Sequence, residues 1–266
     1  MASKSLLQIH QAGNPDKPAI VFLHGSPLSG KMWLPNIASL QDFHCLAPDL
    51  PGHGQSSQTG VWEMNRLVDE LAKIIRTHAK NGNAHIVGLS YGGVVVQALI
   101  SRHPEVVDKA ILSGTSARLS PFMTRVFKLY LNLNKPLIKL LPASWLGKLL
   151  SLQFGIPQEH LGDLADDMKR MDPDVMVGTL LASYLDIQTP VNTDKEILVV
   201  AGEKESPFAK AMARQLVAQI PHARGMLIPK FGHVWNLQDP ILFSQILRWW
   251  FAGEPFDLQK VNLIKN

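Results

Sequence analysis

The sequence has a single cysteine, no long apolar run and no block of like charge, and each absence excludes a class of protein. One cysteine, Cys45, cannot form an intramolecular disulfide, so a disulfide-stapled secreted domain is excluded and a reducing compartment is expected. No apolar stretch reaches the roughly 18 residues of a membrane-spanning helix, and the opening residues lack the apolar segment of a signal peptide. We therefore expect a cytoplasmic protein without stable membrane insertion.

The charge balance is mildly basic. The formal net charge is +4 at pH 7, the cations are spread along the chain, and no nucleic-acid-binding motif occurs. A solvated basic surface is the simpler interpretation, so no nucleic-acid partner is expected; attraction to anionic membranes or acidic substrates is the alternative. The sequence contains no metal-ligand cluster and no dinucleotide-binding fingerprint, so neither a metal nor a cofactor is expected.

Strand-like apolar runs alternate with helix-like segments over most of the 266 residues. Such alternation predicts an α/β fold with helices on both faces of a mostly parallel central sheet. Between residues 64 and 78, the apolar residues Leu67, Leu71, Ile74 and Ile75 recur at helical spacing, as in an amphipathic helix that covers a sheet. The predicted strands are residues 19–23, 45–47, 84–89, 110–113, 197–201 and 225–228.

The alternation stops in residues 117–186, which favour several consecutive helices. We expect a helical cap insertion there, and a core domain formed by residues 1–116 and 187–266. Some apolar residues of this segment could line a pocket, but most must pack the cap onto the core. Lysines interrupt the apolar pattern, which makes docking on a membrane surface conceivable. One predicted stripe comprises Met123, Val126, Phe127, Tyr130 and Leu131.

Residues 88–92 read Gly-Leu-Ser-Tyr-Gly and follow an apolar strand-like run directly before a helix-like segment. This strand-turn-helix context is the one a nucleophile elbow requires. A serine that projects its hydroxyl above a sheet sits in a strained turn, where only small side chains fit two residues to either side. Ser90 is therefore the candidate nucleophile; the alternative is a tight glycine turn with an ordinary serine.

Three further motifs accompany this one, at residues 21–27 (VFLHGSP), 49–56 (DLPGHGQS) and 231–233 (FGH). Together and in this order, the four motifs resemble the α/β-hydrolase superfamily, whose chain order is nucleophile, acid, histidine. The resemblance covers nearly the whole chain. It implies the α/β-hydrolase fold with an inserted cap.

The resemblance places the general base at His233, in a loop after the last predicted strand. Histidine suits this task because its unperturbed pKa lies near 6.5. The acid usually stands in a Gly-x-x-Asp pattern, which reads Gly-Glu-Lys-Glu at residues 202–205, so Glu205 takes its place. A carboxylate there would orient the imidazole. Glu203 is a rival, and Asp186 and Asp194 are less favoured ones.

For the oxyanion hole, the resemblance implies the backbone N–H groups of Ser26 and Tyr91. Two fixed donors aimed at the developing charge stabilise the transition state, by about 3–4 kcal/mol for a single donor. His24 is expected to be a structural residue of the loop after the first motif, and His53 a possible pocket residue.

A serine, a histidine and a carboxylate with an oxyanion hole imply acyl transfer through a covalent acyl-enzyme. The leading hypothesis is a carboxylesterase-like serine hydrolase acting on a small-molecule ester of an apolar acyl group. Carbon–carbon bond hydrolysis or a lyase reaction on the same triad is an alternative, as is a ligand-binding or signalling protein with little turnover. The sequence does not indicate the physiological substrate or the oligomeric state.

Overall fold

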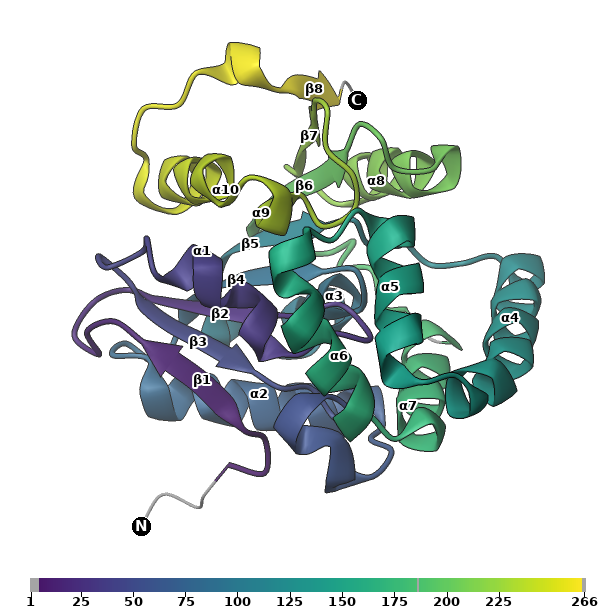
Figure 1. Cartoon of the computed structure of the whole chain (residues 1–266). Helices are drawn as coiled ribbons and strands as arrows, with labels where there is room; N and C mark the ends of the chain where they lie inside the picture. The colour runs from purple at the N-terminus through teal and green to yellow at the C-terminus, as the bar shows by residue number, and fades with distance from the viewer. Residues whose placement is uncertain (1–4, 186, 265–266) are drawn as a thin grey trace.

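Eight strands form one sheet in the order β1-β3-β2-β4-β5-β6-β7-β8 (Figure 1). The computed structural model describes residues 5–185 and 187–264. The strands from β3 to β7 in this order pair in parallel, whereas β1 and β8 pair antiparallel at the two edges. The strands are β1 (Ile9–Ala12), β2 (Ala19–Leu23), β3 (His44–Pro48), β4 (Ala84–Leu89), β5 (Val107–Ser113), β6 (Glu196–Gly202), β7 (Arg224–Ile228) and β8 (Asn262–Ile264).

The six strands predicted from the sequence are confirmed as β2 to β7, and with them the α/β-hydrolase fold class. β2 and β4 are buried along their whole length. Parallel strands covered on both faces produce such continuous apolar runs. The edge strands β1 and β8 were not predicted, because they are short, partly exposed and mix polar with apolar residues.

Helices cover the sheet on both sides (Figure 1). The helix α3 packs against β2, β4 and β5, α2 packs on α3, and α8 packs on β6 and β7, while α1, α9 and α10 contact one another. Leu67, Leu71, Ile74 and Ile75 of α2 are all buried, as their spacing predicts. These helices are α1 (Leu34–Ile37), α2 (Met64–His78), α3 (Tyr91–Arg102), α8 (Pro207–Gln219), α9 (Trp235–Gln238) and α10 (Pro240–Leu247).

Short helical turns complete the connections between these elements. Five are 3₁₀ turns, and the one that continues α10 is a π-helical turn. They are η1 (Gly30–Trp33), η2 (Gly54–Thr59), η3 (Pro104–Val106), η4 (Gln158–His160), η5 (Arg248–Ala252) and η6 (Leu258–Lys260).

In the described part of the chain, four consecutive α-helices lie between β5 and β6. They extend over one side of the sheet, with α4 at the edge of the molecule (Figure 1). The pairs α4 with α7 and α5 with α6 pack together, and α6 and α7 also contact η2 and α3. The segment is helical, as expected. That residues 117–186 form a separate cap domain stays a prediction. The helices are α4 (Pro121–Leu140), α5 (Ala143–Phe154), α6 (Leu161–Arg170) and α7 (Pro173–Leu185).

The stripe predicted on α4 is divided between environments. Leu131 is buried and Phe127 is half-buried, whereas Val126 and Tyr130 are exposed. Cys45 is buried in β3, and burial raises the pKa of its thiol to about 12, so it packs as a small apolar residue. Within residues 5–185 and 187–264, no helix is long and apolar enough to cross a membrane.

Candidate active site

Ser90 lies in a strained turn between β4 and α3. Its backbone has φ 53° and ψ −112°, a region that residues with a side chain rarely adopt. The Ser90 N–H donates to the carbonyl of Ser113 at 2.8 Å, and the Thr115 hydroxyl donates to the Ser90 carbonyl at 2.7 Å. Hydrogen bonds from the neighbouring strand end thus hold the turn in this conformation.

Glycine is required on both sides of Ser90. A Cβ atom at Gly88 would lie 2.6 Å from the carbonyl carbon of Gly92, and one at Gly92 would lie 2.1 Å from the carbonyl oxygen of Leu23. Backbone atoms cannot yield to such contacts. The close packing of strand, turn and helix therefore accounts for the glycines of the motif.

Glu205 and His233 form a hydrogen-bonded pair at the carboxyl ends of the strands. Oε2 of Glu205 lies 2.9 Å from Nδ1 of His233, and Oε1 accepts the N–H of Gly202 at 3.0 Å. Because a carboxylate only accepts, Nδ1 of His233 carries the hydrogen, and Nε2 is left as an acceptor. Glu205 is buried, so both its position and the tautomer of His233 are fixed.

Ser90 and His233 are brought to the same edge of the sheet through β5. Ser90 is bonded to Ser113, and the next residue, Gly114, lies so close to His233 that a Cβ there would be 2.8 Å from Nδ1. No direct hydrogen bond joins Ser90 to His233 among the residues the structure describes. In enzymes without substrate such bonds are often long and tighten on binding.

The rival carboxylates lie elsewhere. Glu203 accepts the N–H of Lys230 at 3.2 Å and the side-chain amide of Asn262 at 3.4 Å, and no hydrogen bond joins it to His233 among the described residues. Asp194 is exposed just before β6, at the opposite end of the strand from Glu205. Asp186 lies outside the described residues. Of the described candidates, Glu205 is thus the one placed beside His233.

Both predicted oxyanion donors border Ser90. Tyr91 is the first residue of α3, so its N–H has no partner within the helix and lies at the positive end of the helix dipole. Ser26 belongs to the loop after β2; its neighbour Gly25 lies against Ser90, where an added Cβ would be 3.3 Å from the Ser90 Cβ. Their roles stay predictions.

His53 does not line the cavity, but its side chain contacts that of Ser26, which does. Its Nε2 lies 2.8 Å from the Ser26 hydroxyl and its Nδ1 lies 2.9 Å from the Pro51 carbonyl. Burial, reinforced by the nearby His24, lowers the pKa of His53 to about 3. The neutral ring must donate from Nδ1 to the carbonyl, so the Ser26 hydroxyl donates to Nε2.

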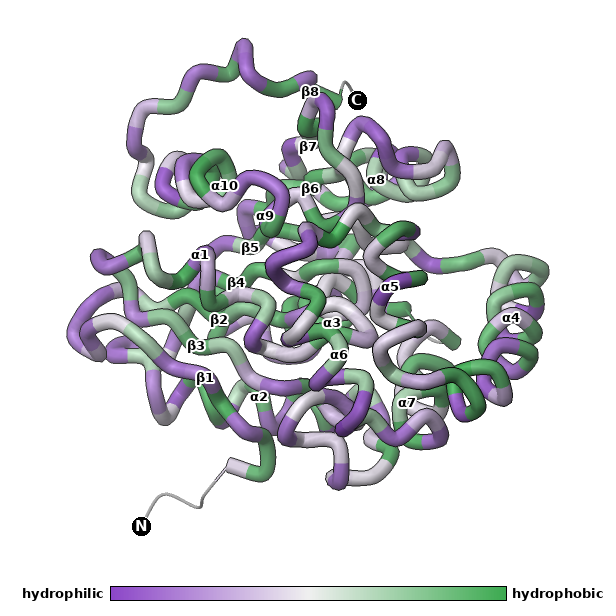
Figure 2. The backbone as a smooth tube through the Cα atoms, viewed as in Figure 1, coloured by the Kyte–Doolittle hydropathy of each residue, from purple (hydrophilic) through white to green (hydrophobic). Residues whose placement is uncertain are grey.

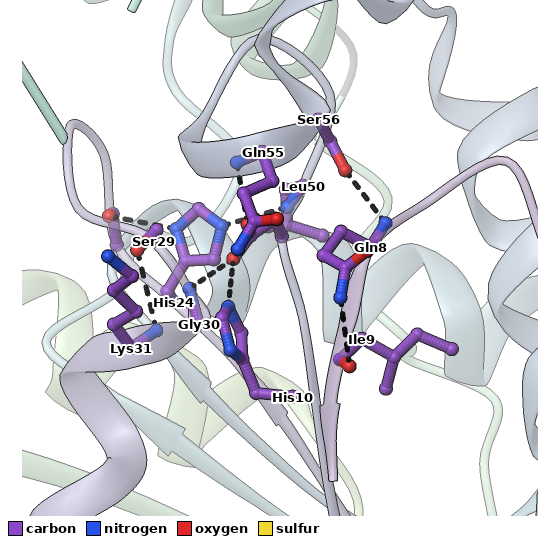
Figure 3. Close-up of polar contacts among 12 residues, drawn as sticks. Gln8, Ile9, His10, His24, Ser29, Gly30, Lys31, Leu50, Gln55 and Ser56 are labelled. Carbon is purple, nitrogen blue, oxygen red and sulfur yellow. Dashed lines mark hydrogen bonds and ion pairs between the residues drawn. The ribbon is translucent and has the colours of Figure 1, made fainter. Parts of the chain in front are cut away.

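A buried network fixes the loop that carries Ser26. Nε2 of His24 accepts the N–H of Leu50 at 2.8 Å, in agreement with a structural role. The carboxylate of Asp49 accepts the N–H groups of Gly30 and Gln55 and binds Nε2 of His10 at 3.0 Å. Figure 3 shows His10, His24, Gly30 and Gln55 gathered around these contacts. The loops after β2 and β3 are thereby held together.

A cavity of about 220 Å³ opens at Ser90. None of the charged side chains that the structure describes lines it, and most of its wall comes from α4 to α7. It is therefore suited to an apolar group. Its lining residues are Ser26, Pro27, Ser90, Tyr91, Phe127, Tyr130, Leu131, Asn134, Ile138, Leu146, Leu150, Gln153, Phe154, Met168, Met171, Met176, Leu180 and Tyr184.

Two residues beside the predicted site were missed by sequence reasoning. Tyr184 of α7 lines the same cavity as Ser90, and burial raises the pKa of its hydroxyl to about 12. The ring of Phe154, at the end of α5, lies with its centroid 5.1 Å from that of His233. Neither residue stands in a motif, because both reach the site only through the packing of the inserted helices.

His233 and Glu205 also border a second, larger cleft of about 790 Å³. Phe154 and Gln153 line both hollows, so the end of α5 separates the apolar cavity from this outer cleft. Among the residues with described positions, no group of three His, Cys, Asp or Glu side chains could hold a metal ion.

Comparison with known proteins agrees with this architecture. The family model for the alpha/beta hydrolase fold matches residues 18–240. An AB hydrolase superfamily protein of Gibberella zeae is 27% identical over 92% of this chain and 84% of its own length. A putative carbamate hydrolase, RutD of Pseudomonas syringae, is 24% identical over 93% and 99%. The structure of a thermophilic esterase from Thermogutta terrifontis superimposes with a TM-score of 0.78 at 21% identity, over 93% of each chain.

Proposed function

Because the chain belongs to the alpha/beta hydrolase family, we propose that it hydrolyses carboxylic esters of apolar acyl groups through Ser90, His233 and Glu205. The observation that supports this most directly is the position of Ser90: a serine in a strained turn that lines a cavity to which no described charged side chain contributes. An anionic or cationic substrate group would lose its hydration there without gaining a counter-charge. A neutral acyl chain gains from burial.

In the proposed reaction, Ser90 attacks the ester carbonyl while Nε2 of His233 takes its proton. The N–H groups of Ser26 and Tyr91 hold the oxyanion. His233 then protonates the leaving alcohol, and an acyl-enzyme remains on Ser90. Water, activated by the same histidine, attacks this intermediate and releases the acid. Glu205 keeps the imidazole in the tautomer that each step needs and stabilises its protonated form.

The proposal is tested by labelling with a serine-directed fluorophosphonate. We expect the wild-type protein to be labelled, Ser90→Ala to lose labelling and His233→Ala to react far more slowly, with ester turnover reduced by about 10³-fold or more. Ser101→Ala, at the far end of α3, is the matched control and should behave as wild type. An unlabelled wild-type protein would instead support the ligand-binding alternative.

A chain-length series of p-nitrophenyl esters, with matched carbamates, tests the choice of bond. We expect ester turnover that rises with acyl length until the chain fills the cavity at Ser90, and slower turnover of carbamates. Labelling without turnover of any ester would move carbon–carbon bond hydrolysis or lyase chemistry ahead of ester hydrolysis, since the same triad serves them all.

A further inference from the structure

The outer face of α4 carries an exposed apolar stripe. Its members recur at intervals of three and four residues, which places them along one side of the helix. Figure 1 shows α4 at the edge of the molecule, and Figure 2 shows apolar residues along its length. Water-exposed side chains of this size are unusual in such a row. The stripe comprises Phe122, Val126, Leu129, Leu133, Leu137 and Leu140.

The next helix repeats the arrangement. Trp145, Leu149 and Leu152 of α5 follow the same spacing, and Leu152 is 84% exposed. The opposite sides of both helices line the cavity at Ser90, through residues such as Phe127 and Leu150. The two helices are thus apolar on two faces, one toward the cavity and one toward solvent.

The charge of these helices has one sign. They carry five cations and no acidic residue. Lys135 and Lys139 pair with Asp174 of α7. Arg125 lies three residues after Phe122 and four before Leu129, and Lys148 lies three residues after Trp145 and four before Leu152, so each borders its stripe on the same flank. The remaining cation is Lys128, and these last three have no ion pair among the described residues.

We propose that the outer stripe of α4 and α5 binds an anionic lipid surface. Apolar side chains would enter the boundary between headgroups and acyl chains, while Arg125 and Lys148 extend to the phosphates. A second copy of this chain fits less well. A symmetric contact would set the same cations against each other, with no acid on either helix to pair with them.

The site would then take its acyl substrate directly from the lipid surface, because α4 and α5 line the cavity at Ser90 and would also contact the lipid. This step rests on the proposed ester hydrolysis, whereas binding to the surface does not. Binding to vesicles therefore tests the stripe on its own. Turnover of a water-soluble p-nitrophenyl ester, measured in parallel, tests the reaction on its own.

The experiment is sedimentation with sucrose-loaded vesicles of phosphatidylcholine, with or without about 30% phosphatidylglycerol. We expect the wild-type protein to pellet with the anionic vesicles and to be released by high salt. Leu129→Gln/Leu133→Gln should lower the partition coefficient by about tenfold or more. Arg125→Gln/Lys148→Gln should lower it several-fold on anionic vesicles alone. None of these side chains lines the cavity, so all variants should keep their turnover of the soluble ester.

The matched control is Leu6→Gln/Ile241→Gln. These two side chains are exposed by 57% and 73%, close to the 59% and 67% of Leu129 and Leu133, but they lie outside the stripe. The control should bind within about twofold of wild type. The proposal is overturned if wild type stays in the supernatant, or if the control loses as much binding as the stripe variant. It is also overturned if light scattering shows a dimer that only the stripe variant dissociates.

Discussion

Glu205 holds His233 by a 2.9 Å hydrogen bond to Nδ1, although it stands where an aspartate is usual in this family. Its second oxygen accepts the N–H of Gly202, three residues earlier. The longer side chain is thus folded back against its own loop. Nε2 of the imidazole is left to face the serine, as the proposed mechanism needs.

The first prediction separates the two glutamates of this loop. Glu205→Gln keeps the shape of the side chain but can favour the wrong tautomer of His233, so kcat should fall by about 10²- to 10⁴-fold. Glu203→Gln is the matched control, because Glu203 bonds to the backbone of Lys230 and should change kcat by less than about threefold. Steady-state ester hydrolysis measures both, and the reverse ranking would assign the acid to Glu203.

The second prediction concerns Tyr184. Its hydroxyl lies on the wall of the cavity that Ser90 also lines and, with a pKa raised by burial to about 12, stays neutral over the working range. Tyr184→Phe removes the hydroxyl and keeps the ring, so kcat/KM should fall by about three- to thirtyfold while fluorophosphonate labelling persists. Tyr130→Phe removes a hydroxyl from the same cavity wall as a control. Equal effects of the two changes would show that the Tyr184 hydroxyl does not assist the reaction at Ser90.

These residues also show how far the sequence could lead. Ser90, Glu205 and His233 follow β4, β6 and β7, and a parallel sheet brings the carboxyl ends of its strands to one edge. Motifs that follow strands therefore predict which residues lie close together in the site. Tyr184 lies on a helix inserted between strands, whose position over the sheet depends on packing that no motif records.

The same limit applies to the inserted helices as a group. α4 has apolar residues on two sides, so periodicity predicted the helix but not which side would face the cavity. Leu131 is buried and Val126 is exposed, although the sequence places both in one stripe. When a helix is apolar on two sides, only the elements that pack against it determine which side is buried.

The third prediction follows from the two buried histidines. Burial lowers the pKa of His24 to about 4 and that of His53 to about 3, from 6.5 in the unfolded chain. Below pH 6.5 the unfolded state binds protons that the folded state does not, so stability falls as the pH falls. Each histidine contributes up to about 1.4 kcal/mol per pH unit.

Urea denaturation between about pH 4.5 and 7.5 measures this dependence. His53→Gln keeps a polar side chain but removes one titrating group, so its free energy of unfolding should depend less steeply on pH than that of wild type. His222→Gln is the control at another described histidine, which lies in the turn between α8 and β7. An unchanged slope in His53→Gln would show that His53 is not the group that titrates.

The last prediction concerns Asp167, a buried carboxylate of α6. Burial raises its pKa from 3.8 to about 6, the nearby Asp49 adds to this, and hydrogen bonds from Ser29 oppose it. Its Oδ1 has no hydrogen-bond partner among the described residues. The folded state therefore holds a proton that the unfolded state has lost, and stability falls as the pH rises from about 4 to 6.

Asp167→Asn removes this charge, so it should raise the free energy of unfolding above pH 6, by an amount on the order of 2 kcal/mol, and by much less at pH 4. Asp166→Asn is the matched control, because Asp166 is exposed on the same helix and should change stability little at either pH. Urea denaturation of both variants at the two pH values makes the comparison. A gain that is equal at both pH values would point to improved hydrogen bonding by the amide, and would show that the charge of Asp167 is not what destabilises the contact between α6 and the core.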